Sequence, residues 1–148
     1  MRLPVVGRLF QKLYIARFAE SSRVLIKGGL TIPQAVEISA HTIGNFVYQD
    51  LLHDAAEQIR KGKLLSQVLA GMPAFPPLVS QLVSVGETTG RLEQLLEKVS
   101  DFYGREVEDI VNNLVTLIQP VLMLFIGGLV ALLFISILSP LYSLSRAF

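Results

Sequence analysis

The sequence has no cysteine among its 148 residues, which excludes disulfide bonds, thiolate metal sites and a thiol nucleophile. It also lacks the phosphate-binding patterns G-x-x-x-x-G-K-S/T and G-x-G-x-x-G, so a nucleotide motor is not predicted. Nothing places a base and an orienting acid beside a Ser, Thr or Tyr nucleophile. These absences predict a protein that is not an enzyme and that uses no cofactor.

Acidic and basic residues are missing from one long stretch. From Ile110 to Ser145, 36 residues in a row are uncharged, and 13 of the 19 positions from Pro120 to Leu138 are Leu, Ile, Val or Phe. At roughly −0.3 to −0.6 kcal/mol each, those side chains favour membrane insertion by about 4–8 kcal/mol. As a helix the segment is about 28 Å long, close to the hydrocarbon thickness of a bilayer. The alternative, a buried core helix, needs more surrounding protein than the remaining chain supplies.

The charged residues that are present are unevenly distributed. Residues 1–27 carry six cations against Glu20 alone, a balance of +5, and residues 87–109 carry seven acids against three cations, a balance of −4. A basic arm beside a membrane segment predicts contact with anionic headgroups. Nucleic acid is disfavoured as a partner because the arm has no recognition motif.

Two charged groups have a second interpretation besides a solvated helix face. The first contains His53, Asp50, Asp54 and Glu57. It offers a loose, oxygen-rich cation site, although neither histidine belongs to an H-x-x-x-H pair. The second is the acidic stripe Glu93, Glu97 and Asp101. It offers a docking strip for basic partners.

Helical signals dominate, and no sustained alternating strand pattern occurs. Thr31-Ile32-Pro33-Gln34 is a capping box with proline in the first turn, and Asn45 is an N-cap signal. The expected helices are about 10–27, 32–42, one from Asn45 to about 60, 66–70, one that opens at Pro76-Pro77, and a last one from about 92 onward. The third has an expected apolar stripe formed by Val47, Leu51, Ala55 and Ile59.

The pattern predicts an all-α fold, an antiparallel helical bundle of five to six helices whose last helix continues into a transmembrane helix. The expected domains are a linker at 1–9, a cytoplasmic helical-bundle domain at 10–112, a transmembrane helix at 113–142 and a short tail at 143–148. Arg91, Lys98 and Arg105 precede the span and only Arg146 follows it, which predicts a cytoplasmic bundle and an outside tail.

Two groups of small residues are candidate interaction sites. The first is the corner formed by Gly86, Glu87, Thr88, Thr89 and Gly90. It predicts a helix–helix turn in which Glu87 or a threonine accepts backbone N–H groups, or else a partner contact. The second is a transmembrane packing face formed by Gly127, Gly128 and Ala131, with Pro120 and Pro140 as points where the helix kinks or ends.

Several segments resemble the type II secretion system F domain family. They are Ala16-Arg17-Phe18 with 27–32, 59–63 with Leu65-Ser66, the corner with its flanks at 85–92, and the prolines Pro120 and Pro140. The corner is similar to the family's G-E-x-S/T-G-x-L signature. Most members carry Glu before the first of the two prolines, where this chain has Gln119. The resemblance covers about Leu3 to Tyr142.

The resemblance implies a non-enzymatic platform or scaffold protein in the inner (plasma) membrane of a bacterial or archaeal-type cell. Such proteins couple a cytoplasmic assembly ATPase to pilin or pseudopilin assembly in type II secretion or type IV pilus machines. The implied partners are that ATPase, the pilin or pseudopilin subunits, other inner-membrane assembly proteins and further copies of the chain as a homo-oligomer. Members hold two such helical domains and three membrane helices, so this chain is expected to be the C-terminal half of a longer protein, or a split version.

An alternative function is a membrane-anchored helical regulatory or receptor subunit of a transporter. That function predicts polar or ionisable residues inside the span, and no charged residue occurs between Ile110 and Ser145. A soluble helical enzyme is a third, weaker hypothesis.

Overall fold

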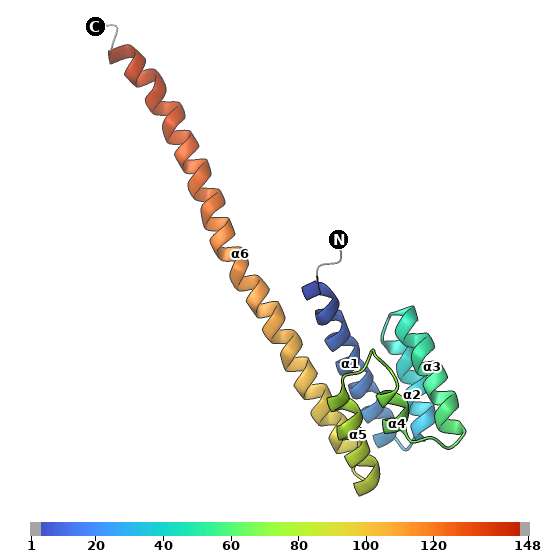
Figure 1. Cartoon of the computed structure of the whole chain (residues 1–148). Coiled ribbons are helices and arrows are strands. Elements are labelled where there is room, and N and C mark those ends of the chain that lie inside the picture. Colours follow the sequence, from blue (N-terminus) through green and yellow to red (C-terminus); the bar gives the residue numbers. More distant parts are fainter. Residues whose placement is uncertain (1–3, 146–148) are drawn as a thin grey trace. The chain divides into compact units, whose positions relative to one another are not determined.

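The computed structural model describes the chain from Pro4 to Ser145, with side chains from Gly7 to Ser136. Within that range all regular structure is helical, which confirms the expected all-α fold (Figure 1). The helices are α1 (Pro4–Lys27), α2 (Ile32–Thr42), α3 (Phe46–Arg60), α4 (Leu65–Ala70), α5 (Pro77–Thr89) and α6 (Leu92–Ser145). The chain divides after Glu108 into a compact helical bundle and a second unit that contains the apolar part of α6.

α1 begins at Pro4, earlier than the expected start at Phe10. Proline is favoured at a helix start because its φ is already helical and its missing N–H is not needed there. The helix ends where expected: the N–H of Gly28 bonds the Val24 carbonyl at 3.0 Å, and that of Leu30 bonds the Leu25 carbonyl at 3.1 Å. Gly29 has a φ of 90°, a left-handed conformation that glycine adopts without strain.

Two expected caps are present in the structure. The Gln34 side-chain oxygen accepts hydrogen bonds from the backbone N–H and the hydroxyl of Thr31, at 3.3 and 2.9 Å, where α2 starts. At the start of α3, Asn45 Oδ1 accepts from the N–H groups of Val47 and Tyr48 at 2.9 and 3.3 Å. Both caps satisfy N–H groups that have no partner within the helix.

The core of the bundle is one apolar cluster to which all six helices or their flanks contribute. Its largest fully buried side chains include Ile15, Phe18, Ile43, Leu52, Leu65, Leu69, Val79, Val83, Leu96 and Val99. Most of the expected stripe of α3 faces the core. Ala55 is buried, and Leu51 and Ile59 are partly buried against the core, whereas Val47 is 66% exposed. Leu52 and Ala56, which the stripe did not include, are also buried, so the face of α3 that meets the core is wider than expected.

α1 and α2 also share a buried polar contact. The hydroxyls of Ser22 and Ser39 are 2.9 Å apart, and Ser39 also donates to the Ala35 carbonyl at 2.6 Å. Both serines have no exposed surface. Because each hydroxyl has a partner, this buried pair carries no desolvation penalty from an unmade hydrogen bond.

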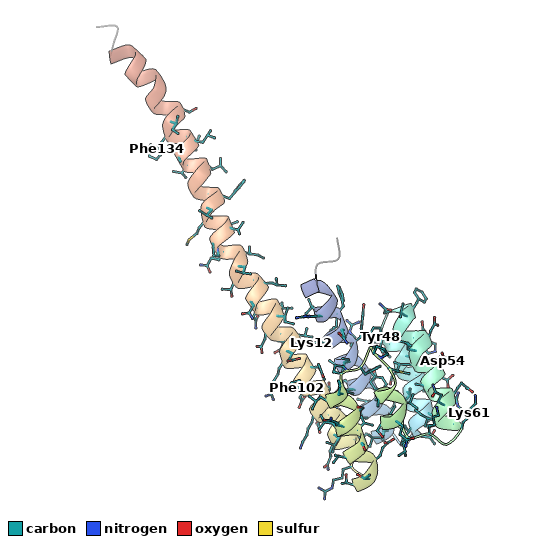
Figure 2. All side chains as sticks on the ribbon, viewed as in Figure 1. Lys12, Tyr48, Asp54, Lys61, Phe102 and Phe134 are labelled. Carbon is teal, nitrogen blue, oxygen red and sulfur yellow. The ribbon has the colours of Figure 1, made fainter. Side chains whose placement is uncertain are left out.

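α6 is a single helix of 54 residues that starts in the core of the bundle and includes the apolar segment. It continues past both Pro120 and Pro140 as far as Ser145, so neither of these prolines, where the sequence predicts a kink or an end, terminates the helix. From Ile110 to Ser136 its side chains carry no charge and are mostly exposed, as in the stretch around Phe134 in Figure 2. By length and composition, α6 could cross a membrane.

Candidate functional site

The corner at Gly86–Gly90 is more helical than expected. α5 continues through Thr89, and only Gly90 leaves the helix, with φ 68° and ψ 19°. The hydroxyls of Thr88 and Thr89 donate to the Val85 carbonyl at 3.0 and 2.7 Å, so the threonines bond backward along α5. Neither acts as the acceptor of N–H groups that the sequence allowed. Gly90 alone makes the reversal into α6, because a left-handed φ is strained for any other residue.

Glu87 is the acceptor at this corner, and it caps a different helix. Its Oε1 accepts from the N–H of Leu65 at 2.7 Å, and its Oε2 accepts from the N–H and hydroxyl of Ser66 at 3.3 and 2.6 Å. These groups belong to the first turn of α4, whose N-cap residue is the apolar Leu64. A carboxylate at a helix start satisfies free N–H groups and opposes the positive end of the helix dipole. Glu87 therefore fastens α5 to α4.

Gly86 allows α5 and α6 to approach closely. The residue is buried and helical. A Cβ atom added to it would lie 2.9 Å from the Leu92 Cα and 3.3 Å from the Leu95 Cβ. The space is occupied by backbone, which has little freedom to shift. The need for glycine thus comes from helix contact at Gly86 and from the positive φ at Gly90.

The acidic stripe of α6 faces the basic face of α1. Lys27 Nζ is 3.6 Å from Glu93, Arg23 Nη1 is 3.9 Å from Glu97, and Lys12 Nζ is 3.0 Å from Glu106. Lys12, Arg23 and Lys27 therefore each have a carboxylate partner inside the bundle. Glu93 and Glu97 of the acidic stripe thus make intramolecular contacts that the sequence pattern did not predict, and Glu106 continues the row beyond the stripe. The sequence does contain a signal for this pairing. From Lys12 to Lys27 along α1, the acidic partners run backward from Glu106 to Glu93 along α6, which is the order that two antiparallel helices require.

Within this face, Glu20 and Arg23 form the tightest pair. Arg23 donates to the two carboxylate oxygens of Glu20 at 3.1 and 2.6 Å. These hydrogen bonds hold the pKa of Glu20 below its ordinary value, and the same contact raises the pKa of Arg23. Both groups therefore stay charged over the physiological pH range.

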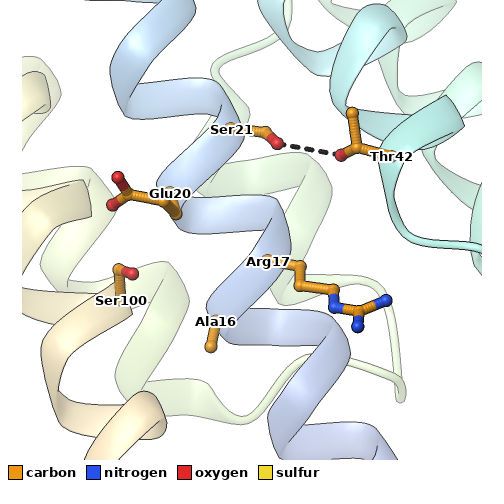
Figure 3. Close-up of a pocket in the computed structure, with 6 residues that line it drawn as sticks. All are labelled: Ala16, Arg17, Glu20, Ser21, Thr42 and Ser100. Carbon is orange, nitrogen blue, oxygen red and sulfur yellow. Dashed lines mark hydrogen bonds between the residues drawn. The ribbon is translucent and has the colours of Figure 1, made fainter.

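A shallow pocket of about 400 Å³ opens beside this pair, between α1, the end of α2 and α6. Figure 3 shows its lining residues Ala16, Arg17, Glu20, Ser21, Thr42 and Ser100. The Ser21 and Thr42 hydroxyls are 2.8 Å apart and bond each other. The only carboxylate in the lining is the one that Arg23 holds, and the lining contains no histidine. These residues do not form a nucleophile with an adjacent base.

The histidines do not form a metal centre within the described part of the chain, where no group of three possible ligands meets. His53 Nδ1 is 3.6 Å from Glu37, and Glu57 bonds Arg60 at 2.5 Å. His41 Nδ1 lies 2.5 Å from the Gln49 amide nitrogen. Two members of the candidate cation group, His53 and Glu57, therefore face partners outside the group.

The candidate packing face on α6 carries no contact that tests it. A Cβ atom added at Gly127 or Gly128 would meet nothing within 4 Å. Space around these glycines is what a close helix partner needs. The role of Gly127, Gly128, Ala131 and Pro120 in helix packing remains a prediction, and the side chain of Pro140 lies outside those that the structure describes.

Comparison with known proteins gives a consistent result. Residues 18–140 match the family model of type II secretion system (T2SS) protein F. The type IV pilus assembly protein PilC of Thermus thermophilus is 38% identical over 145 residues, which is 97% of this chain and 36% of that protein. PilC of Myxococcus xanthus is 37% identical over 145 residues, 98% of this chain and 35% of that protein.

A secretion protein is also among the relatives. Type II secretion system protein F of Pseudomonas aeruginosa is 30% identical over 146 residues, 99% of this chain and 36% of that protein. The chain thus spans about a third of the length of these relatives. The match covers both the helical bundle and the apolar part of α6, and this chain belongs to the type II secretion system protein F family.

Proposed function

We propose that this chain is the C-terminal, membrane-anchored part of an inner-membrane platform that couples a cytoplasmic assembly ATPase to pilin or pseudopilin assembly. The family has members named for type II secretion and for type IV pilus assembly. Its partners under this proposal are the ATPase, the pilin or pseudopilin subunits, other assembly proteins of the membrane, and further copies of the chain. The bundle lies in the cytoplasm and the tail after α6 lies outside.

The observation that supports the proposal is that one helix, α6, is buried in the bundle at its start and is uncharged and apolar further along. Leu92, Leu96, Val99 and Tyr103 of this helix are buried in the core of the bundle, and the same helix continues into the uncharged residues that could cross a membrane. A helix shared in this way joins the bundle to the span without a loop between them. Such a connection suits a protein that couples events in the cytoplasm to events in the membrane.

The chemistry of the bundle also favours coupling over catalysis. Among the described residues, several polar groups of the bundle are engaged in caps and ion pairs, such as Glu87 on α4 and Lys12 on Glu106. We propose that the chain hydrolyses no nucleotide and takes the energy for assembly from its partner. Nucleotide hydrolysis by the purified chain would contradict this part of the proposal.

The proposal is tested by changing the stiffness of α6 between Glu108 and Asp109. An insert of about seven Gly and Ser residues replaces the helical joint with a flexible one, whereas an equally long Ala/Glu/Lys insert adds about two helical turns. In cells that carry the assembly machine, the flexible insert should abolish pili or secretion while the protein stays in the membrane. The helical insert should retain more activity. Equal activity of both variants and the unmodified chain would contradict coupling through α6.

A further inference from the structure

A shallow groove follows α1 in the helical bundle and has two sections. The first is the pocket of about 400 Å³ between α1, the end of α2 and α6, and the second is a hollow of about 520 Å³ between α1 and α6. Glu20 of α1 and Ser100 of α6 line both sections. In Figure 3 these two side chains lie on the α6 side of α1, opposite Ser21 and Thr42. Every lining residue precedes Asp109, so the groove belongs to the bundle alone.

The second section, which we call the side groove, has one stripe of α6 as a wall. The stripe consists of Glu97, Asp101, Gly104 and Glu108. These positions are spaced i, i+4, i+7 and i+11, and such a spacing places residues on one face of a helix. The stripe is about 16 Å long, or three helical turns. It is therefore long enough for a helical segment to lie along it.

The acids of the stripe are exposed, and cations of the bundle neutralise them little. Among the described side chains, Asp101 and Glu108 form no ion pair. Glu97 lies 3.9 Å from Nη1 of Arg23, but Arg23 also bonds both carboxylate oxygens of Glu20. Four carboxylates and two guanidinium groups line the side groove, a balance of −2. The side groove is therefore negatively charged.

Gly104 lies within the stripe, and the packing of the bundle does not require a glycine there. Its φ is not left-handed, and an added Cβ atom would meet nothing within 4 Å. Glycine inside a helix is destabilising relative to alanine. At Gly86 the close contact of α5 with α6 explains the glycine, whereas no described neighbour explains it at Gly104. Independently of charge, this glycine points to a partner that approaches the backbone of α6 closely.

Charge and shape together select the class of partner. A negatively charged groove repels nucleic acid and anionic lipid and attracts a segment that carries cations. A straight stripe of three turns suits a helix laid into a groove, which is a common mode of peptide recognition. Arginine or lysine residues at the spacing of the three acids would each meet one carboxylate. The side groove thus fits a basic helical segment of a protein.

We propose that the side groove binds a basic helical segment of another protein. Gly104 is the point of closest approach, and the cations of the segment pair with the acids of the stripe. The inference goes beyond the proposed function, because it assigns a partner surface to the bundle and depends neither on the membrane span of α6 nor on coupling. It also narrows the docking strip expected from the sequence: Glu93 holds Lys27 within the bundle, whereas Asp101 stays available for a partner.

Two dye-labelled, alanine-rich peptides are the probes, each of about 18 residues so that a helix can form. One carries arginine at positions spaced i, i+4 and i+11, and the other carries glutamate at the same positions. Fluorescence anisotropy measures their binding to the full chain in an uncharged detergent. We expect the basic peptide to bind, with an affinity that falls as salt is added, and the acidic peptide not to bind.

Three variants of the chain locate the binding site. Asp101→Asn with Glu108→Gln removes two carboxylates of the stripe. Asp50→Asn with Asp54→Asn is the matched control, because it removes two exposed carboxylates of α3. We expect the first to weaken binding of the basic peptide about three- to tenfold and the second to leave it unchanged. Gly104→Gln fills the space beside α6 and should weaken binding at least as much, while the unfolding temperature does not fall.

The other results overturn the inference. No binding of the basic peptide, or equal weakening by the stripe variant and the α3 control, excludes the side groove as the site. Unchanged binding in Gly104→Gln excludes close approach at that residue. Self-association of the chain that the stripe variant and Gly104→Gln both abolish, measured by sedimentation, assigns the side groove to a second copy instead. None of these results bears on coupling through α6, which the insert between Glu108 and Asp109 tests separately.

Discussion

Gly86 is the residue at which packing leaves the least room. We expect Gly86→Ala to destabilise the bundle by about 1–3 kcal/mol, because the added methyl group would meet the backbone of Leu92. Gly104→Ala is the matched control: this helical glycine has nothing within 4 Å of an added Cβ atom, so alanine should stabilise it by about 0.5–1 kcal/mol. Thermal unfolding of the full chain in detergent measures both. Similar shifts for the two variants would contradict the close contact.

Glu87 is the second residue with a specific expectation. In Glu87→Gln the carboxylate is lost, and the amide nitrogen cannot accept the hydrogen bonds that one of the two oxygens accepts. We expect a loss of about 1–3 kcal/mol and faster hydrogen exchange at the Leu65 and Ser66 amides, which Glu87 now binds. Glu108→Gln changes an exposed carboxylate of α6 and should leave both measurements unchanged. Unaltered exchange in Glu87→Gln would exclude the capping role.

Sequence patterns predicted residues whose role is local and missed those whose partner is distant. Asn45 and Gly90 act within a few residues of themselves, so cap and turn preferences were sufficient. Glu87 binds the first turn of α4, 22 residues away at Leu65, and spacing alone did not identify that partner. The requirement for glycine at position 86 likewise depends on where α6 crosses α5.

At the scale of helices, α1 carries a pair whose charge state depends on pH. The pKa of Glu20 is lowered by its hydrogen bonds from Arg23. A carboxylate with a lowered folded-state pKa adds stability above its unfolded-state pKa, and that stability is lost as the pH falls through the folded value. We expect the unfolding temperature to fall as the pH drops below the ordinary pKa of a glutamate, and to fall less steeply in Glu20→Gln. Asp54→Asn, at an exposed site, should retain the unmodified slope, and equal slopes in all three proteins would exclude the pair as a source of acid sensitivity.

The positions of the helices were easier to predict than the face of each helix that is buried. The order of the six helices and most of their ends followed from caps, glycines and apolar spacing. The buried face of α3 followed only in part. Leu51, Ala55 and Ile59 lie in or against the core as expected, but the adjacent Leu52 is the more deeply buried leucine and Val47 is exposed, because packing against neighbouring helices sets which of two adjacent apolar residues is covered. The pairing of α1 with α6 was also missed, since a charge pattern on one helix shows its partner only when the two are compared.

At the scale of the whole molecule, the first expectation is topology. The cations that precede the span outnumber those that follow it, which favours a cytoplasmic bundle. A reporter that is active only outside the membrane should therefore give a signal when fused after Phe148 and none when fused before Arg2. The opposite pattern in a stably inserted protein would reverse the orientation.

The second expectation concerns association of copies in the membrane. Gly127→Leu combined with Ala131→Leu should weaken oligomers, because larger side chains prevent close helix approach. Insertion should be retained, since leucine is more apolar than either residue. Crosslinking in membranes measures the oligomers, and Leu124→Ile together with Leu132→Ile provides a control that keeps side-chain size at exposed positions of the same helix. Unchanged crosslinking would exclude this face as the contact.

The antiparallel row of ion pairs between α1 and α6 has a mechanical consequence. Lys27–Glu93, Arg23–Glu97 and Lys12–Glu106 are arranged along the axes of the two helices. A load applied along α6 would act on all three in shear, together with the buried side chains beside them, and would not open them one at a time as a zipper opens. Each such surface pair contributes only about 0–1 kcal/mol at equilibrium. Simultaneous rupture nevertheless makes the bundle more resistant to a pull along α6 than to a pull across it.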